Sequence, residues 1–438
     1  MFVSLDVIKF PKKIGKPFGD LPKNMYLCRR KLKVNMSTYK TYLEFIRYAL
    51  NPKGERPKDV AKMDWDGFFQ FADEQAILGM MYDGRKQMAD ESGMRDEEGF
   101  MDDLTLEWGF EAQQIKEQNE AINRKCVEVQ KELQEAGFQC CILKGQGNSL
   151  LYPKPYRRMP GDIDVWVKCD GRCKMEEGRG KRDDVKEVIR FVKERNPEAR
   201  AVYHHIDGGE IDDIEVEVHY KPSFMNNLIH NRRLQKWFEQ KAPEQFGHKV
   251  ELPDGAGEIC TPTTDFNTVY LLAHIYRHLM QEGIGLRQII DYYYVLKTNT
   301  NGTNGTNIRD MLRRLTSSTS VATRQCVNEF PLHSLLRRLG LWKIAGAVMW
   351  VLNEVLGLEE KYLIAPKDER LGKVLLAEIV NGGNFGQYDS DNIKADNQLK
   401  KNWQRICRDF RLMRYFPSEC LWEPVFRIYH FFWRLRYN

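Results

Sequence analysis

The sequence predicts an α+β fold, in which a mixed sheet is flanked by N- and C-terminal all-helical regions. Three observations support this prediction. Residues 36–137 carry apolar side chains at helical spacing, residues 138–258 contain short segments that alternate as strands do, and residues 259–438 return to helical spacing. The 438 residues are 42% hydrophobic and 29% charged, a globular composition that excludes a wholly disordered chain.

The N-terminal part divides into a tail and a helical region. Residues 1–35 are basic, and their prolines and glycines predict a loose tail. From Met36 onward, apolar residues form a helical stripe, and further helices are expected at about 65–90 and 103–136. The last of these carries Trp108, Ile115, Ile122 and Val129 at intervals of about seven residues.

The central region has the pattern of an α+β module. A short apolar run after Gly137 predicts the first strand, and three later segments alternate with a period of two. A turn rich in Gly and Asp at 207–213 is expected to join the last two strands. An amphipathic helix with an acidic start and a basic end is expected at 183–195. The predicted strands are 138–143, 162–167, 201–206 and 214–220.

The C-terminal region is predicted to be helical around one break. The polar repeat at 298–307 (TNTNGTNGTN) predicts a surface loop, and the run LWKIAGAVMWVLNEVLGL predicts a buried helix. The last residues, LWEPVFRIYHFFWRLRYN, mix aromatic residues with arginines. For this segment we favour a helix packed on its own domain over one lying on a membrane surface.

Charge and cysteine usage limit the class of protein. The 67 basic and 62 acidic residues leave a net charge of +5, too small to indicate a nucleic-acid partner. No apolar stretch approaches the roughly 20 residues of a membrane span, and the first residues lack a secretory h-region. Ten scattered cysteines without a zinc-type spacing favour a reducing compartment, so we expect a cytoplasmic protein.

Two aspartates on one predicted strand are the strongest sign of chemistry. Alternation places Asp162 and Asp164 on one face of the strand, about 6–7 Å apart at Cα, with Ile163 and Val165 on the other. Carboxylate oxygens suit Mg²⁺ or Mn²⁺, and burying two unpaired carboxylates is costly without a cation. The alternative is a pair of solvent-facing aspartates at a sheet edge.

Two further segments fit the same chemistry. On the strand at 214–220, Glu215, Glu217 and His219 share one face and offer a third metal ligand, although an ordinary half-exposed strand fits this pattern equally well. Lys144 and Gly145 follow the first strand, where the glycine lets the backbone approach a phosphate that the lysine neutralises.

A helical segment at 274–291 could line the cleft on the side opposite the sheet. His274, Arg277 and His278 lie on one helical turn, and Arg287 and Asp291 follow after two glycines. This face is a candidate site for phosphate or acceptor, and the alternative is a solvated helix face.

The stretch at 142–167, ILKGQGNSLLYPKPYRRMPGDIDVWV, resembles the uncharacterised nucleotidyltransferases of the DNA polymerase β-like superfamily. Downstream, Glu217-Val218-His219-Tyr220 matches the family's acidic-hydrophobic-His-aromatic pattern, which selects Glu217 over Glu215 as the third carboxylate. The family often has Asp there. The resemblance extends from about Met36 to the C-terminus and includes 274–296 and 382–386. Its core elements are Leu143-Lys144-Gly145, Leu151-Tyr152-Pro153, Arg158 and Gly161-Asp162-Ile163-Asp164.

The resemblance implies a polymerase β-like mixed sheet core that transfers a nucleotidyl group from an NTP, such as ATP, and releases pyrophosphate. It implies that Asp162, Asp164 and Glu217 hold two Mg²⁺ ions, or Mn²⁺, with Glu217 as a candidate base. The implied nucleotide-binding residues are Lys144, Gly145, Arg158, His219, Arg277 and His278. Gln146 stands where the superfamily usually has Ser, and His219 is equally well explained as a structural residue.

The acceptor is left open by the sequence. A sugar phosphate, an RNA end and a protein side chain all remain candidates, with a small molecule favoured because no RNA-binding module is evident. The resemblance also implies a bacterial protein of surface polysaccharide metabolism. Two alternatives are a glycosyltransferase that binds a nucleotide-sugar through its Asp-x-Asp pair, and a non-catalytic nucleotide-binding module.

Overall fold

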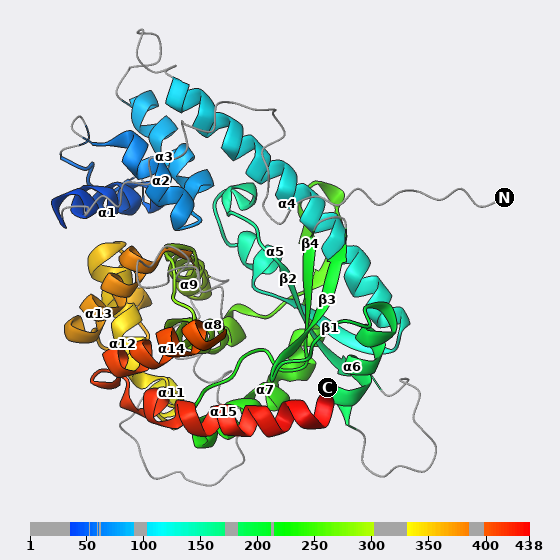
Figure 1. Cartoon of the computed structure of the whole chain (residues 1–438). Helices are drawn as coiled ribbons and strands as arrows, with labels where there is room; N and C mark the ends of the chain where they lie inside the picture. Colours follow the sequence, from blue (N-terminus) through cyan, green and yellow to red (C-terminus); the bar gives the residue numbers. More distant parts are fainter. Residues whose placement is uncertain are drawn as a thin grey trace, which may run out of the picture.

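A computed structural model of the chain confirms the α+β fold, with a mixed four-stranded sheet between helical regions (Figure 1). The predicted tail at 1–35 lies outside the described residues. The structure describes residues 36–51, 53–58, 60, 63–91, 103–170, 183–211, 214–301, 331–384 and 398–438.

Four helices precede the sheet: α1 (Met36–Leu50), α2 (Trp65–Glu74), α3 (Leu78–Glu91) and α4 (Asp103–Glu135). The predicted apolar stripe of α4 is buried along its length, from Trp108 to Val129. At its start, the Trp108 indole packs against Phe68 and donates a hydrogen bond to the Leu78 carbonyl at 3.2 Å. Helix α4 then runs from these helices to the sheet, as Figure 1 shows, and joins the two parts of the fold.

The sheet has the strand order β1-β2-β4-β3, with β1 (Phe138–Leu143), β2 (Ile163–Cys169), β3 (His205–Ile211) and β4 (Ile214–His219). Strands β2 and β4 are parallel, and the other two pairings are antiparallel. Helices α4 and α6 (Asp184–Arg195) cover the face that carries Ile163, Val165 and Val216. On the opposite face, Trp166 packs against Phe238 and Phe266 of α7 (Leu228–Gly247) and α8 (Thr264–Gln281).

The third strand differs from the prediction. A strand was expected at 201–206 with a turn at 207–213, but β3 begins at His205 and runs through the glycines to Ile211. The strand passes through this segment because a register shift between Asp207 and Glu210 accommodates Gly208 and Gly209. Gly209 has a φ of +90°, a conformation that glycine adopts readily.

After a small hairpin of β5 (Lys249–Leu252) and β6 (Gly257–Cys260), the elements in the described part of the chain are helices. The predicted loop at 298–307 begins later than expected, because α9 (Leu286–Asn301) continues to Asn301, and residues 302–307 lie outside the described part. The predicted buried run forms α12 (Trp342–Trp350) and a π-helical turn (Val351–Val355). The other helices are α11 (Pro331–Arg338), α13 (Glu369–Gly382), α14 (Gln398–Met413) and α15 (Pro417–Tyr437).

None of the described helices combines the length and the apolar character that crossing a bilayer requires.

Candidate active site

The acidic residues of the two parallel strands meet on one face of the sheet. Asp162 immediately precedes β2, and the register pairs Asp164 of β2 with Glu217 of β4. Glu215 is instead exposed and lies opposite Glu210 of the edge strand. Ligand atoms of Asp164, Glu217 and His219 all lie within 4.8 Å of one another. The sheet therefore brings two carboxylates and an imidazole into the range of one metal ion.

Asp164 is almost completely buried and has a cationic partner at each oxygen. The Lys144 ammonium lies 2.6 Å from Oδ2, and His219 Nε2 lies 2.7 Å from Oδ1. Burial alone would raise the pKa of Asp164, but Lys144 and His219 outweigh it and hold this pKa well below its usual range. Asp164 is therefore an ionised carboxylate in the interior of the protein.

His219 connects the two carboxylates, because its Nε2 also lies 3.1 Å from Glu217 Oε2. Burial alone would lower the pKa of His219, but hydrogen bonds to Asp164 and Glu217 raise it above the ordinary value. His219 Nε2 is thus within hydrogen-bonding distance of both acids.

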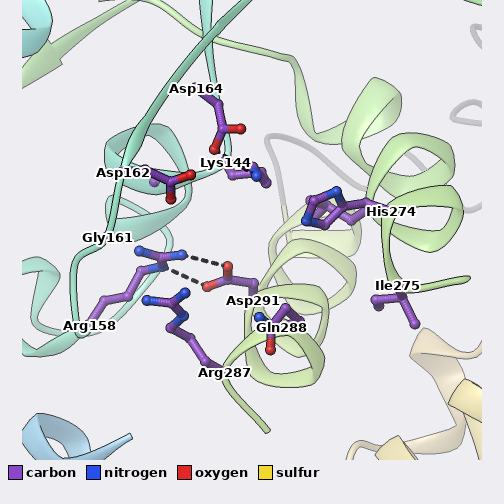
Figure 2. Close-up of a pocket in the computed structure, with 12 residues that line it drawn as sticks. Lys144, Arg158, Gly161, Asp162, Asp164, His274, Ile275, Arg287, Gln288 and Asp291 are labelled. Atoms are coloured by element: carbon purple, nitrogen blue, oxygen red, sulfur yellow. Dashed lines mark hydrogen bonds and ion pairs between the residues drawn. The ribbon is translucent and has the colours of Figure 1, made fainter. Parts of the chain in front are cut away.

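Asp162 lies at the mouth of this cluster, with its carboxylate near Lys144 in Figure 2. Repulsion by Asp164, together with burial, raises the pKa of Asp162 to about 6. No described residue forms an ion pair with Asp162. A cation bound between the two aspartates would remove this repulsion, so the donor set fits a divalent ion.

The turn after β1 has an unusual backbone. Lys144 has φ +53° and ψ −128°, a conformation rare outside glycine, and Gly145 follows with φ +33°. A Cβ built on Gly145 would meet no atom within 4 Å, so the backbone is open to the pocket at this point. The strained turn places the Lys144 ammonium on Asp164 and exposes the Gly145 backbone beside it.

A pocket of about 480 Å³, partly open to solvent, lies between this turn and the C-terminal helices. One wall contains the Lys144–Gly145 turn and the two aspartates, and the opposite wall comes from α8 and α9 (Figure 2). Of the predicted opposite face, His274, Arg287 and Asp291 line the pocket. Arg287 donates to the Met159 and Pro160 carbonyls at 3.2 and 3.0 Å, which fixes the segment before Asp162.

Arg158 lines the pocket, but its guanidinium is already paired. It forms two hydrogen bonds to Asp291 of α9, Nε to Oδ1 at 2.8 Å and Nη2 to Oδ2 at 2.9 Å, drawn as dashed lines in Figure 2. The Tyr152 hydroxyl donates to the same carboxylate at 2.6 Å. Arg158 therefore joins the sheet module to α9, and its expected contact with the triphosphate stays a prediction.

Four predicted site residues are not among those that line the pocket: Glu217, His219, Arg277 and His278. Arg277 contacts His204, and its Nη2 lies 3.2 Å from His278 Nε2. His278 in turn contacts Glu282 at 3.1 Å, and burial lowers its pKa. Gln146, at the position usually occupied by Ser, is buried and donates to Asn123 of α4 rather than facing the pocket.

The sequence prediction missed His204 and His205 at the start of β3. His205 Nδ1 lies 3.2 Å from Glu217 Oε2 and 3.1 Å from His204 Nε2. Burial lowers the pKa of His205 to about 4, so it contacts Glu217 as a neutral imidazole. The adjacent histidines were visible in the sequence, but the displaced strand boundary concealed their position opposite His219.

A protein-family model described as uncharacterised nucleotidyltransferase matches residues 61–326. The chain belongs to this family. The match spans the long helix, the sheet and the pocket, and therefore every residue described in this site. A comparison with proteins of curated function gives no match.

Among solved structures, the chain is similar to an antigenic nucleotidyltransferase-like protein from Paracoccidioides brasiliensis. The identity is 14%, the alignment covers 59% of this chain and 95% of that one, and the TM-score is 0.27. A similarity this weak informs neither the fold nor the activity.

Proposed function

We propose that the protein is an Mg²⁺-dependent nucleotidyltransferase, which transfers a nucleotidyl group from an NTP to an acceptor hydroxyl or phosphate and releases pyrophosphate. The observation that supports this proposal most strongly is that acidic side chains and an open backbone turn lie in one site. Asp162 and Asp164 line the same pocket as the open Lys144–Gly145 turn, and Glu217 lies with Asp164 and His219 in the range of one metal ion. Family membership supports the same reaction class.

The acidic cluster fits a hard divalent cation. Its carboxylates supply oxygen ligands, and the mutual repulsion of Asp162 and Asp164 is the electrostatic condition that such an ion relieves. When bound, Mg²⁺ held by Asp162, Asp164 and Glu217 would supply positive charge to the triphosphate and lower the pKa of the attacking group. Mn²⁺ has the same ligand preference and is the second candidate.

The chain's own residues have separable roles in this proposal. The Gly145 backbone approaches a phosphate, because no atom stands where a side chain would be. Lys144, which pairs with Asp164 in this structure, neutralises phosphate charge when a divalent ion takes over that carboxylate. Arg287 is a further pocket cation held in place by two carbonyls. Glu217 accepts the acceptor proton, while His205 and His219 orient its carboxylate.

The donor is better explained as an NTP than as a nucleotide-sugar. A glycosyltransferase of the Asp-x-Asp type needs a nucleotide-binding α/β domain before the pair, whereas the elements described before β1, outside residues 1–35 and 92–102, are the helices α1 to α4. We propose a small-molecule acceptor, such as a sugar phosphate of surface polysaccharide synthesis, because the net charge of +5 does not indicate a nucleic acid.

Thermal unfolding with each of the four NTPs, with and without Mg²⁺, tests the proposal. A ligand present at 100 times its Kd stabilises the folded state by about 2.7 kcal/mol. We expect a shift that requires Mg²⁺, identifies the preferred base and disappears in Asp164→Asn. No shift with any NTP, but one with a nucleotide-sugar and Mn²⁺, would overturn the proposal in favour of the glycosyltransferase.

A further inference from the structure

Helix α15 has two apolar faces, and the inner one is firmly packed. Phe426 stacks on Phe224 at 4.9 Å between ring centroids, and Trp433 stacks on Tyr220 at 5.8 Å. At its end, the Asn438 side chain accepts from the Ala201 amide at 3.0 Å and donates to the Ala201 carbonyl at 2.9 Å. The helix is therefore held on the sheet module, whereas the sequence predicted that it packs on the C-terminal helical domain (Figure 1).

The outer face of α15, which we define by Leu421, Val425, Ile428, Phe432 and Leu435, is exposed. These side chains are 61%, 44%, 62%, 63% and 67% accessible. Their spacing alternates between four and three residues, so they form one continuous stripe along the helix. Tyr429 and Phe431 are also exposed and widen the stripe. Because the inner face already packs on the protein, burial in the core does not explain this second one.

Within residues 405–438 the exposed charges have one sign, although Arg411 pairs with Glu378 and Arg436 with Asp183 of neighbouring elements. Residues 405–438, all of which the structure describes, contain seven arginines and three acidic residues. The acidic residues Asp409, Glu419 and Glu423 are all buried. The arginines exposed to solvent are Arg411, Arg414, Arg434 and Arg436.

We propose that the outer face of α15 docks on an anionic phospholipid surface. An exposed apolar stripe of Leu, Ile and Phe flanked by arginines is the pattern of helices that lie in the plane of a membrane interface. Side chains of the stripe enter the acyl boundary, while the arginines contact lipid phosphates. A second copy of this chain fits less well, because its arginines would meet arginines without an exposed acidic partner in this segment.

Docking in this orientation leaves the inner contacts of α15 intact. Tyr203, which packs on Phe426, precedes the His204–His205 pair beside Glu217. The proposed surface is thus rigidly attached to the candidate active site. Docking would hold that site at a fixed distance from the bilayer without a change of fold.

Vesicle co-sedimentation of the full chain tests this proposal. Vesicles of phosphatidylcholine alone are compared with vesicles in which part of the lipid is phosphatidylglycerol. We expect binding only to the anionic vesicles, weakened by salt, and about 100-fold weaker in Ile428→Ser/Phe432→Ser/Leu435→Ser.

A matched control is available on α4, where Leu106 and Phe110 are 53% and 51% exposed. The variant Leu106→Ser/Phe110→Ser removes similar exposed apolar surface elsewhere and should bind like the wild type. The thermal stability of both variants is measured to show that they fold.

Equal binding of the triple variant and the wild type, or no binding to anionic vesicles, would overturn the proposal. Size-exclusion chromatography with light scattering tests the remaining alternative, in which the stripe mediates self-association. A dimer that the triple variant loses, without vesicle binding by either protein, would assign the stripe to self-association instead.

Discussion

The buried pair of Arg158 and Asp291 gives a sharp test of how the sheet module is joined to the C-terminal helices. Both side chains are 6% exposed, and two hydrogen bonds connect them. Asp291→Asn keeps the size of the side chain but removes its charge, which leaves a buried guanidinium without its anion. Removing one partner of such a pair costs about 3–5 kcal/mol of unfolding free energy.

This loss converts into a measurable change of Tm. At about 2.1 cal/mol/K per residue over 438 residues, it lowers the Tm by about 3–5 °C when the chain unfolds as one unit. Nearby Arg287 adds to the effect, because its positive charge is no longer balanced by Asp291. The assay is differential scanning calorimetry of the wild type and Asp291→Asn in the same buffer.

A matched control and a double variant make the result specific. The Arg195–Glu132 pair has side chains 46% and 49% exposed, so Glu132→Gln should cost less than about 1 kcal/mol. Replacing both buried partners, in Arg158→Met/Asp291→Leu, should recover part of the loss, because the Arg158 guanidinium is removed together with its anion, although Arg287 still lacks the charge of Asp291. If Asp291→Asn changes the Tm no more than Glu132→Gln does, the pair is not buried as described and the reasoning fails.

Three further outcomes are expected. Glu217→Gln should abolish Mg²⁺-dependent NTP stabilisation whereas Glu215→Gln retains it, and equal losses in the same thermal assay would contradict the register of β4. Gly79→Ala should lower the Tm despite the higher helix propensity of Ala, because the new Cβ would lie 2.5 Å from the Arg157 carbonyl; a raised Tm would contradict this packing. Burial and Glu423 raise the pKa of Asp409 from 3.8 to about 7, so the stability it contributes when protonated is lost as the pH rises through that range. The Tm of the wild type minus that of Asp409→Asn should therefore fall between pH 4 and 8, and a constant difference would refute the assignment.

Periodicity was sufficient to predict α4 and β2, although for different reasons. The stripe of α4 is buried as predicted. Strand β2, which begins at Ile163, is buried on both faces over Ile163–Val167, so its alternation is one of polar and apolar side chains and not of core and solvent. Strand β3 lacks such an alternation, because Gly208 and Gly209 interrupt it at the edge of the sheet. The pairing of β3 with β4 determines where β3 begins and ends. A local sequence pattern carries no information about that pairing.

The same limit applies to the candidate site. Strand alternation predicted that Asp162 and Asp164 share one face, whereas the family resemblance selected Glu217 over Glu215 as the third carboxylate. Of the polar face that the sequence predicted on α8, His274 lines the pocket whereas Arg277 and His278 do not. Almost every residue of that helix is buried, so helical spacing alone did not show which of its sides faces the pocket. Contacts such as Arg158 with Asp291 join residues 133 positions apart and depend on the packing of whole elements.

The charges of the pocket suggest how a nucleotide would enter it. Lys144 is paired with Asp164 and Arg158 with Asp291, so two of the lining cations are already neutralised by the protein. Arg287 and Asp162 then nearly balance each other. A triphosphate alone would bring negative charge toward Asp162, whereas a divalent ion cancels the repulsion between the aspartates and that of the phosphates together. The electrostatics therefore favour joint binding of metal and nucleotide, which is why the requirement for Mg²⁺ in NTP stabilisation is the decisive part of the proposed test.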